Sequence, residues 1–326
     1  MSTIRAAYAA KIDPEQPLSG LAIGPIDEPA KPADDWVRVE VRASALNHHD
    51  LWSLRGVGLA ESQLPMVLGC DAAGFGPDGT EVIVHAVIGD PSGGDETLDP
   101  KRSLLSEVHP GTLAETVWVP ARNLVPKPAS MSFVDAACLP TAWLTAYKML
   151  LSKGRLQDGN AVLVQGAGGG VASAAVVLAQ ALGARVYATS RSGAKREQIA
   201  ALGATALEPG ARLPERVDVV IETVGSPTIE HSLKSTAPGG RIVICGSTGG
   251  HLAEIDLRRV FFLQLELLGS TMGTRDELVA VAALMADRGI KPVIDSIYPF
   301  EQAADAFARL ASGDVFGKVV LDHIQK

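Results

Sequence analysis

Residues 161–195 read AVLVQGAGGGVASAAVVLAQALGARVYATSRSGAK, and this stretch decides the fold. Ala161–Gln165 is an apolar run that predicts a buried strand, and a glycine cluster follows it at once. A helix is expected from about Val171 to Leu182, followed by a second strand that ends at Thr189. Glycines are needed where a diphosphate approaches the main chain, and a helix amino terminus supplies free N–H groups. This order of elements predicts a Rossmann unit that binds a dinucleotide.

The glycine spacing departs from the usual G-x-G-x-x-G pattern. The best register is Ala167-x-Gly169-x-x-Ala172, with small residues at both ends. A glycine-rich turn that serves only helix–strand packing is the alternative, but the strand and helix on its two sides favour coenzyme binding. We therefore expect Gly169, Gly170 and Val171 to lie along the diphosphate.

The residues after Thr189 bear on the choice of coenzyme. An Asp or Glu there would bind the ribose hydroxyls of NAD, but the sequence has Ser190 and Arg191, with Lys195 one turn later. Hydroxyl and positive groups fit a 2′-phosphate, so we predict NADPH in preference to NADH. The alternative is that Arg191 and Lys195 are solvated surface charges.

The flanking sequence has two characters. Before the glycine cluster, residues 37–87 contain short apolar runs broken by Gly, Pro and Asp, which predict a β-barrel with tight turns. Residues 90–110 are rich in turn formers and predict an exposed loop. From residue 137 onward, β-rich runs alternate with segments of helical length, which predicts a parallel sheet. The end of the chain predicts helices at 276–287 and 300–311 and a strand at 318–321.

Composition limits the classes of partner. The 326 residues, 47% of them hydrophobic, suffice for two packed cores. With 37 acidic against 29 basic side chains and no outstanding run of Lys or Arg, we expect no nucleic-acid partner. No apolar stretch reaches the roughly 18–20 residues of a membrane span, and the amino terminus lacks a signal-peptide core. A cytoplasmic protein without a membrane partner, with its three separated cysteines reduced, is therefore expected.

Five segments in order resemble one family along nearly the whole chain. Together with the glycine turn, SALNHHDLW (44–52), VLGCDAAG (67–74), LPTAWLTAY (139–147) and FGKVVL (316–321) resemble the medium-chain dehydrogenase/reductase superfamily. Within it, the chain resembles the zinc-free, quinone-oxidoreductase-like branch. The resemblance implies an α/β protein with a GroES-like β-barrel catalytic domain and a Rossmann coenzyme domain with a doubly wound parallel sheet. The expected ranges are 1–136 for the former, 137–270 for the latter, and 271–326 for a segment that returns to the catalytic domain.

The same resemblance tests for a metal. Zinc-dependent relatives have a cysteine at the position of Asn47 and a His-Glu pair at the positions of Cys70 and Asp71. Asparagine is a poor zinc ligand, and residues 90–110 lack the four cysteines of the relatives' structural-zinc lobe. We therefore predict no metal. The alternative is an adventitious zinc site, formed if Cys70, Asp71, Cys138 and the two histidines His48 and His49 cluster in space.

Without a metal electrophile, reduction of an already electron-poor carbon is favoured over carbonyl–alcohol exchange. The resemblance implies an NADPH-dependent reductase whose small-molecule substrate is a quinone or an α,β-unsaturated carbonyl compound. Two alternatives stay open: a zinc-free alcohol or aldehyde reductase, and a non-catalytic NADPH-binding sensor or scaffold. In the family, the edge strand that residues 265–275 would supply commonly pairs across a two-fold axis, which implies a homodimer.

The resemblance also assigns roles to residues near the first motif. Asn47 would bond near the nicotinamide or its ribose, unless it is only a turn-forming residue. His48 would donate to the substrate oxygen and relay a proton, with a structural or surface histidine as the alternative. Asp50 is expected to hold the loop. Trp52 and Arg55 are candidate walls of the substrate pocket, although Trp52 could belong to the core.

Further coenzyme contacts are expected from the rest of the chain. Thr145 would join the diphosphate, and Thr223, Gly246 and Ser247 lie at later strand ends, where open α/β sheets bind ligands. Lys318 resembles the family's terminal basic residue and would reach a phosphate; a surface lysine is the alternative.

Overall fold

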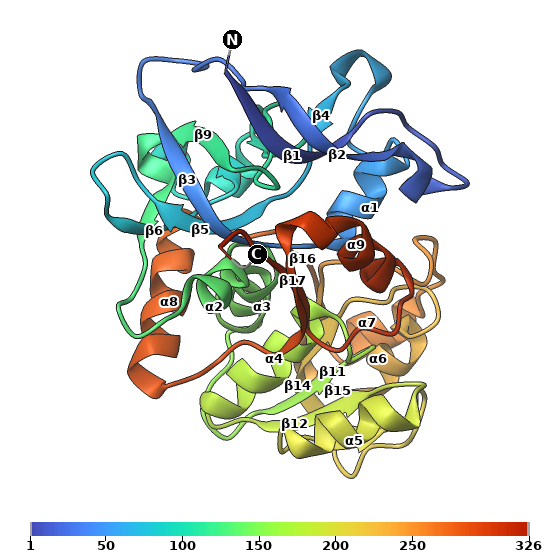
Figure 1. Ribbon diagram of the computed structural model, residues 1–326. Coiled ribbons are helices and arrows are strands. Elements are labelled where there is room, and N and C mark those ends of the chain that lie inside the picture. Colours follow the sequence, from blue (N-terminus) through green and yellow to red (C-terminus); the bar gives the residue numbers. More distant parts are fainter. Residues whose placement is uncertain (1, 325–326) are drawn as a thin grey trace. The chain divides into compact units, whose positions relative to one another are not determined.

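A computed structural model describes residues 2–324 and divides the chain into two compact units (Figure 1). Unit 1 is Met1–Ala142 together with Met272–Lys326, and unit 2 is Trp143–Thr271. The sequence-based boundaries stood at 136/137 and 270/271, and the residues numbered 1, 325 and 326 in those ranges lie outside the described part. Between residues 2 and 324, no helix combines the length and the apolar character needed to cross a bilayer.

Unit 2 is built on a six-stranded parallel sheet, as the alternating pattern predicted. Its strand order is β13-β12-β11-β14-β15-β16, and every neighbouring pair is parallel. The strands are β11 (Ala161–Val164), β12 (Arg185–Thr189), β13 (Thr205–Leu207), β14 (Val217–Glu222), β15 (Thr236–Ile244) and β16 (Glu266–Gly269). The helices are α3 (Leu144–Tyr147), α4 (Gly170–Ala181), α5 (Gly193–Ala201), α6 (Ile229–Ser235) and α7 (Leu257–Phe262), and π-helical turns flank α3 at Leu139–Trp143 and Lys148–Lys153.

The strand order of unit 2 reverses direction beside β11. From β11 the chain first builds outward through β12 and β13, and then returns to add β14 on the other side of β11. Ligands of open α/β sheets bind outside the carboxyl ends of the strands at such a reversal. The glycine turn begins at this edge, between β11 and α4.

Unit 1 is predominantly β, as predicted. A seven-stranded sheet has the order β10-β6-β5-β3-β18-β17, with β9 paired to β3, and a second sheet has the order β2-β1-β4. The strands are β1 (Thr3–Ala9), β2 (Leu21–Asp27), β3 (Trp36–Ala45), β4 (Met66–Val67), β5 (Asp71–Phe75), β6 (Glu81–Val84), β7 (Val87–Ile88), β8 (Ser103–Leu104), β9 (Thr116–Pro120), β10 (Leu124–Pro126), β17 (Ile294–Pro299) and β18 (Lys318–Asp322). The helices are α1 (His48–Leu54), α2 (Phe133–Ala137), α8 (Arg275–Arg288) and α9 (Ala303–Ala311).

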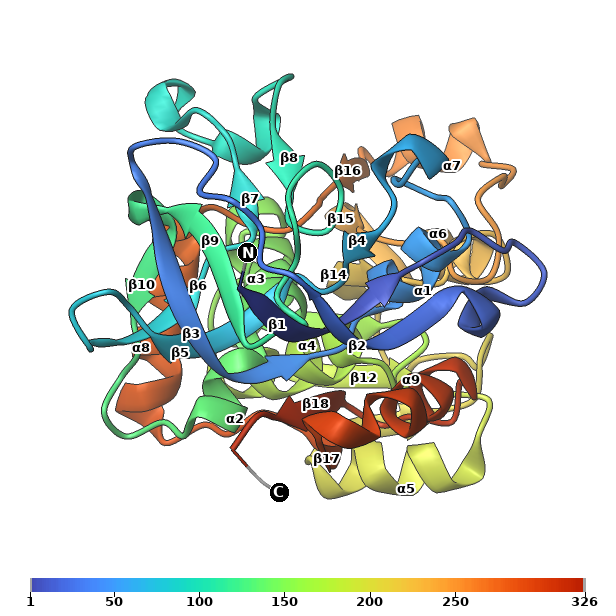
Figure 2. The ribbon, with the colours of Figure 1, turned by 45° about the horizontal axis from the view of Figure 1, so that its top comes forward.

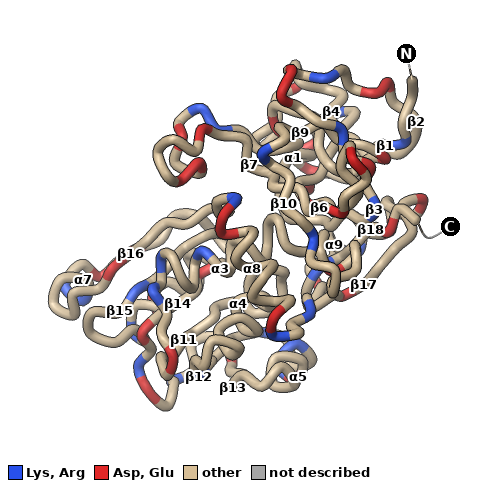
Figure 3. Tube along the Cα trace, turned by 90° about the vertical axis from the view of Figure 1, so that its left-hand side faces the viewer, with Lys and Arg blue, Asp and Glu red and all other residues tan. Residues whose placement is uncertain are grey.

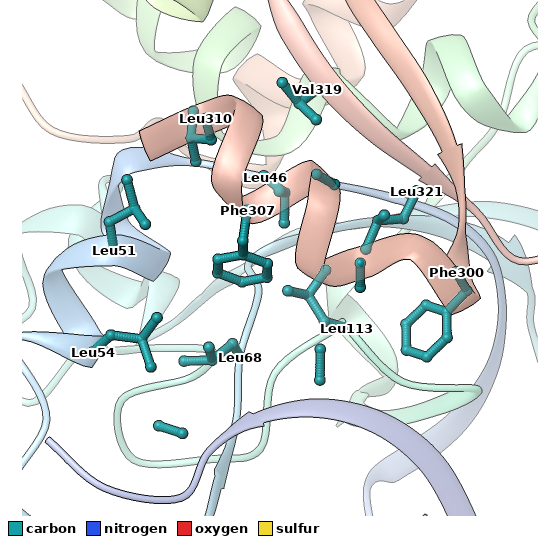
Figure 4. Close-up of a cluster of buried hydrophobic side chains, with 14 of the residues drawn as sticks. Leu46, Leu51, Leu54, Leu68, Leu113, Phe300, Phe307, Leu310, Val319 and Leu321 are labelled. Atoms are coloured by element: carbon teal, nitrogen blue, oxygen red, sulfur yellow. The ribbon is translucent and has the colours of Figure 1, made fainter. Parts of the chain in front are cut away.

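The carboxyl-terminal segment is an integral part of unit 1. Strand β18 pairs antiparallel with β3 and parallel with β17, and α9 lies beside both strands (Figure 2). Phe307 and Leu310 of α9 pack into the same apolar cluster as Leu51 and Leu54 of α1 (Figure 4). This packing brings the start of β18 next to the residues that precede α1.

The expectation of an exposed loop at residues 90–110 is only partly correct. Glu96 is 3% exposed, and its Oε1 accepts a hydrogen bond of 2.8 Å from the backbone N–H of Arg275. Arg275 opens α8, so the carboxylate meets the positive end of a helix, and the Arg122 guanidinium lies 3.5 Å away. These contacts draw the loop into the unit, and Leu105 and Ser106 at its far end are fully buried.

Charges of both signs are interspersed along the chain (Figure 3). Many of them form salt bridges within their own unit, as Arg5 does with Glu115 in unit 1 and Arg185 with Glu215 in unit 2. Exposed pairs of this kind contribute little to stability, about 0–1 kcal/mol each.

Candidate functional site

The turn between β11 and α4 leaves main-chain amides open. Gly166 has a φ of 66°, and a Cβ there would lie 2.3 Å from Cγ2 of Val224, so only glycine fits. Gly169 precedes the first turn of α4, and no side chain caps that turn. Apart from Gly169 and its two chain neighbours, no described atom lies within 4 Å of the point that a Cβ on Gly169 would occupy. A helix amino terminus that no side chain caps, with open space beside Gly169, fits the diphosphate of a dinucleotide.

The residues predicted for the 2′-phosphate follow β12. Ser190 is 6% exposed, whereas the side chain of Arg191 is exposed. The Ser192 hydroxyl accepts a hydrogen bond from Lys195 N and so caps α5. Cδ of Lys195 lies 3.0 Å from the position of a Cβ on Gly168. The Lys195 side chain therefore runs beside the glycine turn.

Arg196 is a residue whose role sequence reasoning missed. Its Nη1 donates to the carbonyl oxygens of Ser190 and Arg191, at 2.9 and 3.1 Å, and its Nη2 donates to Oε1 of Glu208 at 3.0 Å. Arg196 therefore holds the backbone of this loop, which leaves the exposed Arg191 as the side chain that can meet a phosphate. The sequence offered no signal for this division between two nearby arginines.

The other predicted coenzyme residues of unit 2 lie on α3 and on two strand ends. Thr223 Oγ1 donates to the carbonyl oxygen of Gln165 at 3.1 Å, and a Cβ on Gly246 would lie 3.1 Å from the Thr223 carbonyl oxygen. The structure thus brings Thr223 and Gly246 together. Ser247 is exposed, and Thr145, on α3, is 5% exposed. Contact of these four residues with a coenzyme stays a prediction.

Lys318 is the centre of a buried polar group in unit 1. Its side chain is 2% exposed, and Nζ donates to Leu46 O at 2.8 Å, Asn47 Oδ1 at 2.6 Å and Asp71 Oδ2 at 2.9 Å. The alternative of a surface lysine is therefore wrong. An ammonium has three N–H groups, and all three are engaged here, so none is left for the phosphate contact that we predicted.

Asn47 and Asp50 complete this arrangement. Asp50 Oδ2 accepts a hydrogen bond of 2.8 Å from Asn47 N at the start of α1, so Asp50 holds the loop as expected. Burial raises the pKa of Asp50 to about 6. The Asn47 side chain donates from Nδ2 to Asp71 Oδ2 at 2.9 Å and accepts from Lys318. Its contact with nicotinamide stays a prediction.

The side chains at the relatives' zinc positions have hydrogen-bond partners within the protein. The ammonium of Lys318 lies between Asn47 and Asp71, where it would repel a second cation. Cys70 does not join them, because its thiol lies against Leu105 O, at 3.3 Å. One oxygen of Asp71, Oδ1, has no hydrogen-bond partner among residues 2–324. In that range, no three His, Cys, Asp or Glu side chains are grouped to hold a metal ion.

His49 makes contacts that the sequence did not indicate. Its Nε2 lies 3.0 Å from Oε1 of Glu107, and its Nδ1 lies 3.6 Å from Cys70 Sγ and 3.5 Å from Ser106 Oγ. Burial opposes a charge on the ring, but Cys70 and Glu107 outweigh it and raise the pKa of His49. Burial also raises the pKa of the Cys70 thiol. Of the expected His–Cys cluster, the contact between His49 and Cys70 forms. The thiol of Cys138 instead donates a hydrogen bond to Val134 O.

The remaining candidates of unit 1 lie on or directly after α1. His48 starts this helix, Trp52 lies within it and Arg55 follows its last residue, and all three are exposed. Trp52 is 37% exposed, so its assignment to the core is wrong. Although part of His48 is exposed, the atoms around its ring desolvate it, and this effect, followed by the charge of Lys318, lowers the pKa of His48 and favours a neutral imidazole. These side chains are free to meet a small molecule.

Comparison with protein families finds two matches. Residues 33–129 match the alcohol dehydrogenase GroES-like domain, and residues 195–321 match the family described as zinc-binding dehydrogenase. The first confirms the GroES-like character of unit 1.

Individual proteins match along most of the chain. The chain is 30% identical to an acryloyl-coenzyme A reductase of Metallosphaera sedula, over 93% of this chain and 96% of that protein. It is 29% identical to a phenolphthiocerol/phthiocerol polyketide synthase protein of Mycobacterium tuberculosis over 97% of this chain, but spans only 15% of that protein's length.

Two solved structures are also similar. The structure of a NAD-dependent alcohol dehydrogenase superposes with a TM-score of 0.88 at 34% identity, covering 98% of this chain and 99% of the other. A 2-octenoyl-CoA carboxylase reductase in complex with NADP and 2-octenoyl-CoA superposes with a TM-score of 0.90 at 25% identity, covering 99% and 88%.

Proposed function

The chain belongs to the medium-chain dehydrogenase/reductase superfamily, and from this premise we propose that it reduces a quinone or an α,β-unsaturated carbonyl compound with NADPH and without zinc. The observation that carries the proposal is the buried ammonium of Lys318, held by Asn47 and Asp71. This group stands where zinc-dependent relatives have ligands, and it supplies the positive charge that balances Asp71. Unit 2 supplies the coenzyme-binding residues, and unit 1 supplies the residues that act on the substrate.

The donor set of unit 1 favours reduction of a carbon–carbon double bond. Zinc polarises a carbonyl when three protein ligands hold it, and the side chains at Asn47, Cys70 and Asp71 are engaged with other partners. A double bond conjugated to a carbonyl is already electron-poor and needs less polarisation. An enoyl thioester is the form that we favour, since similar proteins are named acryloyl-coenzyme A reductase and 2-octenoyl-CoA carboxylase reductase.

The residues of unit 2 have distinct tasks toward the coenzyme. The amides of Gly169, Gly170 and Val171 would bind the diphosphate, and Arg191 with Lys195 would bind the 2′-phosphate of NADPH. When bound, NADPH supplies the hydride. The complex of a similar reductase with NADP supports this choice, whereas the similar alcohol dehydrogenase is described as NAD-dependent. NADH is therefore the alternative coenzyme.

His48 is the side chain of unit 1 that we assign to proton transfer to the substrate. It is exposed at the start of α1, whereas both ring nitrogens of the neighbouring His49 face protein partners, Glu107 on one side and Cys70 with Ser106 on the other. Trp52 lies on the same helix and is exposed, and so is Val57, whose backbone N–H donates to Trp52 O. These two side chains offer an apolar surface near His48. Such a surface suits the hydrocarbon part of an enoyl substrate.

The proposal is tested by following NADPH and NADH absorbance with an enoyl thioester, a quinone and an aldehyde in parallel. We expect oxidation of NADPH with the enoyl thioester or the quinone, at a higher kcat/KM than with NADH. Turnover of the aldehyde alone would select the zinc-free alcohol or aldehyde reductase. Tight NADPH binding without oxidation by any of the three would select the sensor or scaffold.

We also propose that the chain forms a homodimer through the β16 edge of unit 2. β16 is the last strand of its sheet, and an edge strand can pair with its own copy across a two-fold axis. Shortly before it in the sequence, four large apolar side chains are exposed: Leu252, Leu257, Phe261 and Phe262. Large exposed apolar groups of this kind mark a surface that another protein covers.

Replacement of both Phe261 and Phe262 by Asp is expected to convert the dimer to a monomer, because four charges would meet across the two-fold axis. Sedimentation velocity measures the change. Leu98→Asp is the matched control, since Leu98 is similarly exposed but belongs to unit 1. A monomeric unaltered protein, or a dimer that survives the double change, would contradict the proposed interface.

A further inference from the structure

Three neighbouring strands of unit 2 end in buried polar side chains. Thr189 ends β12, Gln165 follows β11, and Glu222 ends β14, and all three are fully buried. Because β12, β11 and β14 are adjacent and parallel, their carboxyl ends share one edge of the sheet. Buried polar groups are costly unless they are hydrogen-bonded, so the contacts of these three side chains identify what they are for.

A continuous chain of hydrogen bonds joins the three strand ends. Thr189 Oγ1 donates to Gln165 Oε1 at 2.7 Å, and Gln165 Nε2 donates to Ser232 Oγ at 3.0 Å. Ser232 Oγ then donates to Glu222 Oε2 at 2.7 Å. Ser232 lies on α6 and is fully buried as well, so the chain is closed to solvent along its length.

His231 fixes which groups donate and which accept along this chain of hydrogen bonds. Its Nε2 lies 2.9 Å from the carbonyl oxygen of Ala211, to which it must donate. In the neutral imidazole Nδ1 is then an acceptor, and it takes a hydrogen bond of 2.9 Å from Gln165 Nε2. The Gln165 amide therefore has one satisfactory orientation, with its oxygen toward Thr189 and its nitrogen toward Ser232.

The ends of the chain hold the backbone of two loops. At Glu222, Oε1 accepts from Val224 N at 2.9 Å, Gly225 N at 3.0 Å and Thr228 Oγ1 at 2.8 Å. With Ser232 on its other oxygen, the carboxylate accepts four hydrogen bonds and orders the loop that follows β14.

At the opposite end, the network reaches the glycine turn. Gly166 N donates to Thr189 Oγ1 at 3.2 Å. The two loops also touch directly. Cγ2 of Val224 lies only 2.3 Å from the point that a Cβ on Gly166 would occupy. A shift of Val224 would therefore change the contact that shapes the first residue of the turn.

We propose that Glu222 is a positioning residue for the coenzyme. It is fully buried and acts through its neighbours: its carboxylate fixes the loop after β14 and, through Ser232 and Gln165, the glycine turn. The inference rests on the proposed function, in which that turn grips the coenzyme diphosphate. Binding of the diphosphate by the glycine turn then depends on one buried carboxylate beneath both loops.

The test is the affinity of Glu222→Gln for both coenzymes, measured by fluorescence titration at a temperature where circular dichroism shows the variant folded. The NH₂ group of Gln would face either Val224 N and Gly225 N, which can only donate, or Ser232 Oγ, whose hydroxyl would have to reverse from donor to acceptor and so break the chain. We expect the Kd for NADPH and the Kd for NADH to rise by the same factor, about tenfold, the lower end of the effect known for the outer-shell partners of metal ligands. Tyr187→Phe is the control, because it removes a partly buried hydrogen bond to Glu215 that lies outside the network. It is expected to leave both Kd values unchanged.

A second variant covers the case in which Glu222→Gln does not fold. Ser232→Ala removes one of the four hydrogen bonds to Glu222 and breaks the chain, so both Kd values should rise by a smaller common factor. If folded variants lower the melting temperature but keep unaltered Kd values, Glu222 is merely structural and the inference is overturned. Failure of the unaltered protein to bind either coenzyme would instead overturn the proposed function.

Discussion

Lys318→Met is expected to lower the free energy of unfolding of unit 1 by about 3–5 kcal/mol, the usual cost of leaving a buried charge without its partner. The change removes the ammonium that Asn47, Leu46 and Asp71 share, and Asp71 is fully buried. Methionine fills a similar volume, so the loss reflects charge rather than a cavity. Urea unfolding followed by hydrogen exchange in peptides of β3 and β18 measures it.

Two further variants separate this effect from a general effect of substitution. Lys291→Met is the matched control, because Lys291 is an exposed lysine of the same unit. It should change stability by less than about 0.5 kcal/mol. Adding Asp71→Asn to Lys318→Met should recover part of the loss, since no unpaired charge then remains. A Lys318→Met protein as stable as Lys291→Met would show that Asp71 finds its counter-charge elsewhere.

Arg191→Ala is expected to weaken NADPH binding by about 1–3 kcal/mol, roughly 5- to 150-fold, while NADH binding stays nearly unchanged. The reason is that Arg191 is exposed after β12, whereas Arg196 is held by the loop backbone and Glu208. Only the 2′-phosphate distinguishes the two coenzymes. Isothermal titration with each coenzyme measures the difference.

Arg216→Ala is the control for the loss of an exposed arginine in unit 2. Arg216 precedes β14 and so lies at the amino end of the sheet, away from the strand ends that would bind a coenzyme. It should leave both affinities unchanged. Equal losses for NADPH and NADH in Arg191→Ala would remove the 2′-phosphate assignment, while the proposal for the diphosphate would stand.

The local elements could be predicted from the sequence because short-range patterns specify them. The run from Ala161 to Thr189 indicated the strand, the turn, the helix and the second strand within one residue of the observed bounds. The helices predicted at 276–287 and 300–311 correspond to α8 and to α9 with its preceding turn. Periodicity and glycine placement are properties of neighbouring residues, so one sequence is enough to read them.

The buried charge group could not be predicted, because its members are far apart in the chain. Lys318 and Asp71 are separated by 247 positions, and the pairing of both β18 and β5 with β3 brings them together. No local pattern distinguishes a lysine that binds a buried carboxylate from one at the surface. The network beneath the glycine turn has the same character, since Gln165 and Ser232 are 67 positions apart.

The expected His–Cys cluster is incomplete because the side chains of two adjacent residues, Cys70 and Asp71, point in opposite directions. Cys70 and Asp71 are neighbours at the start of β5, and successive side chains of an extended chain point to opposite faces. Cys70 therefore lies with His49, and Asp71 with Lys318. The residue types were evident from the sequence, but the face of the strand to which each side chain points was not.

The measurement that tests the central claim most directly is the rate of NADPH oxidation with an enoyl thioester after zinc has been stripped from the protein. Metal content is determined by mass spectrometry on the same sample. We expect an unchanged rate at a zinc content far below one atom per chain, because Lys318 supplies the charge that a metal would supply in zinc-dependent relatives. A rate that falls with the zinc content and returns when zinc is added would contradict the account.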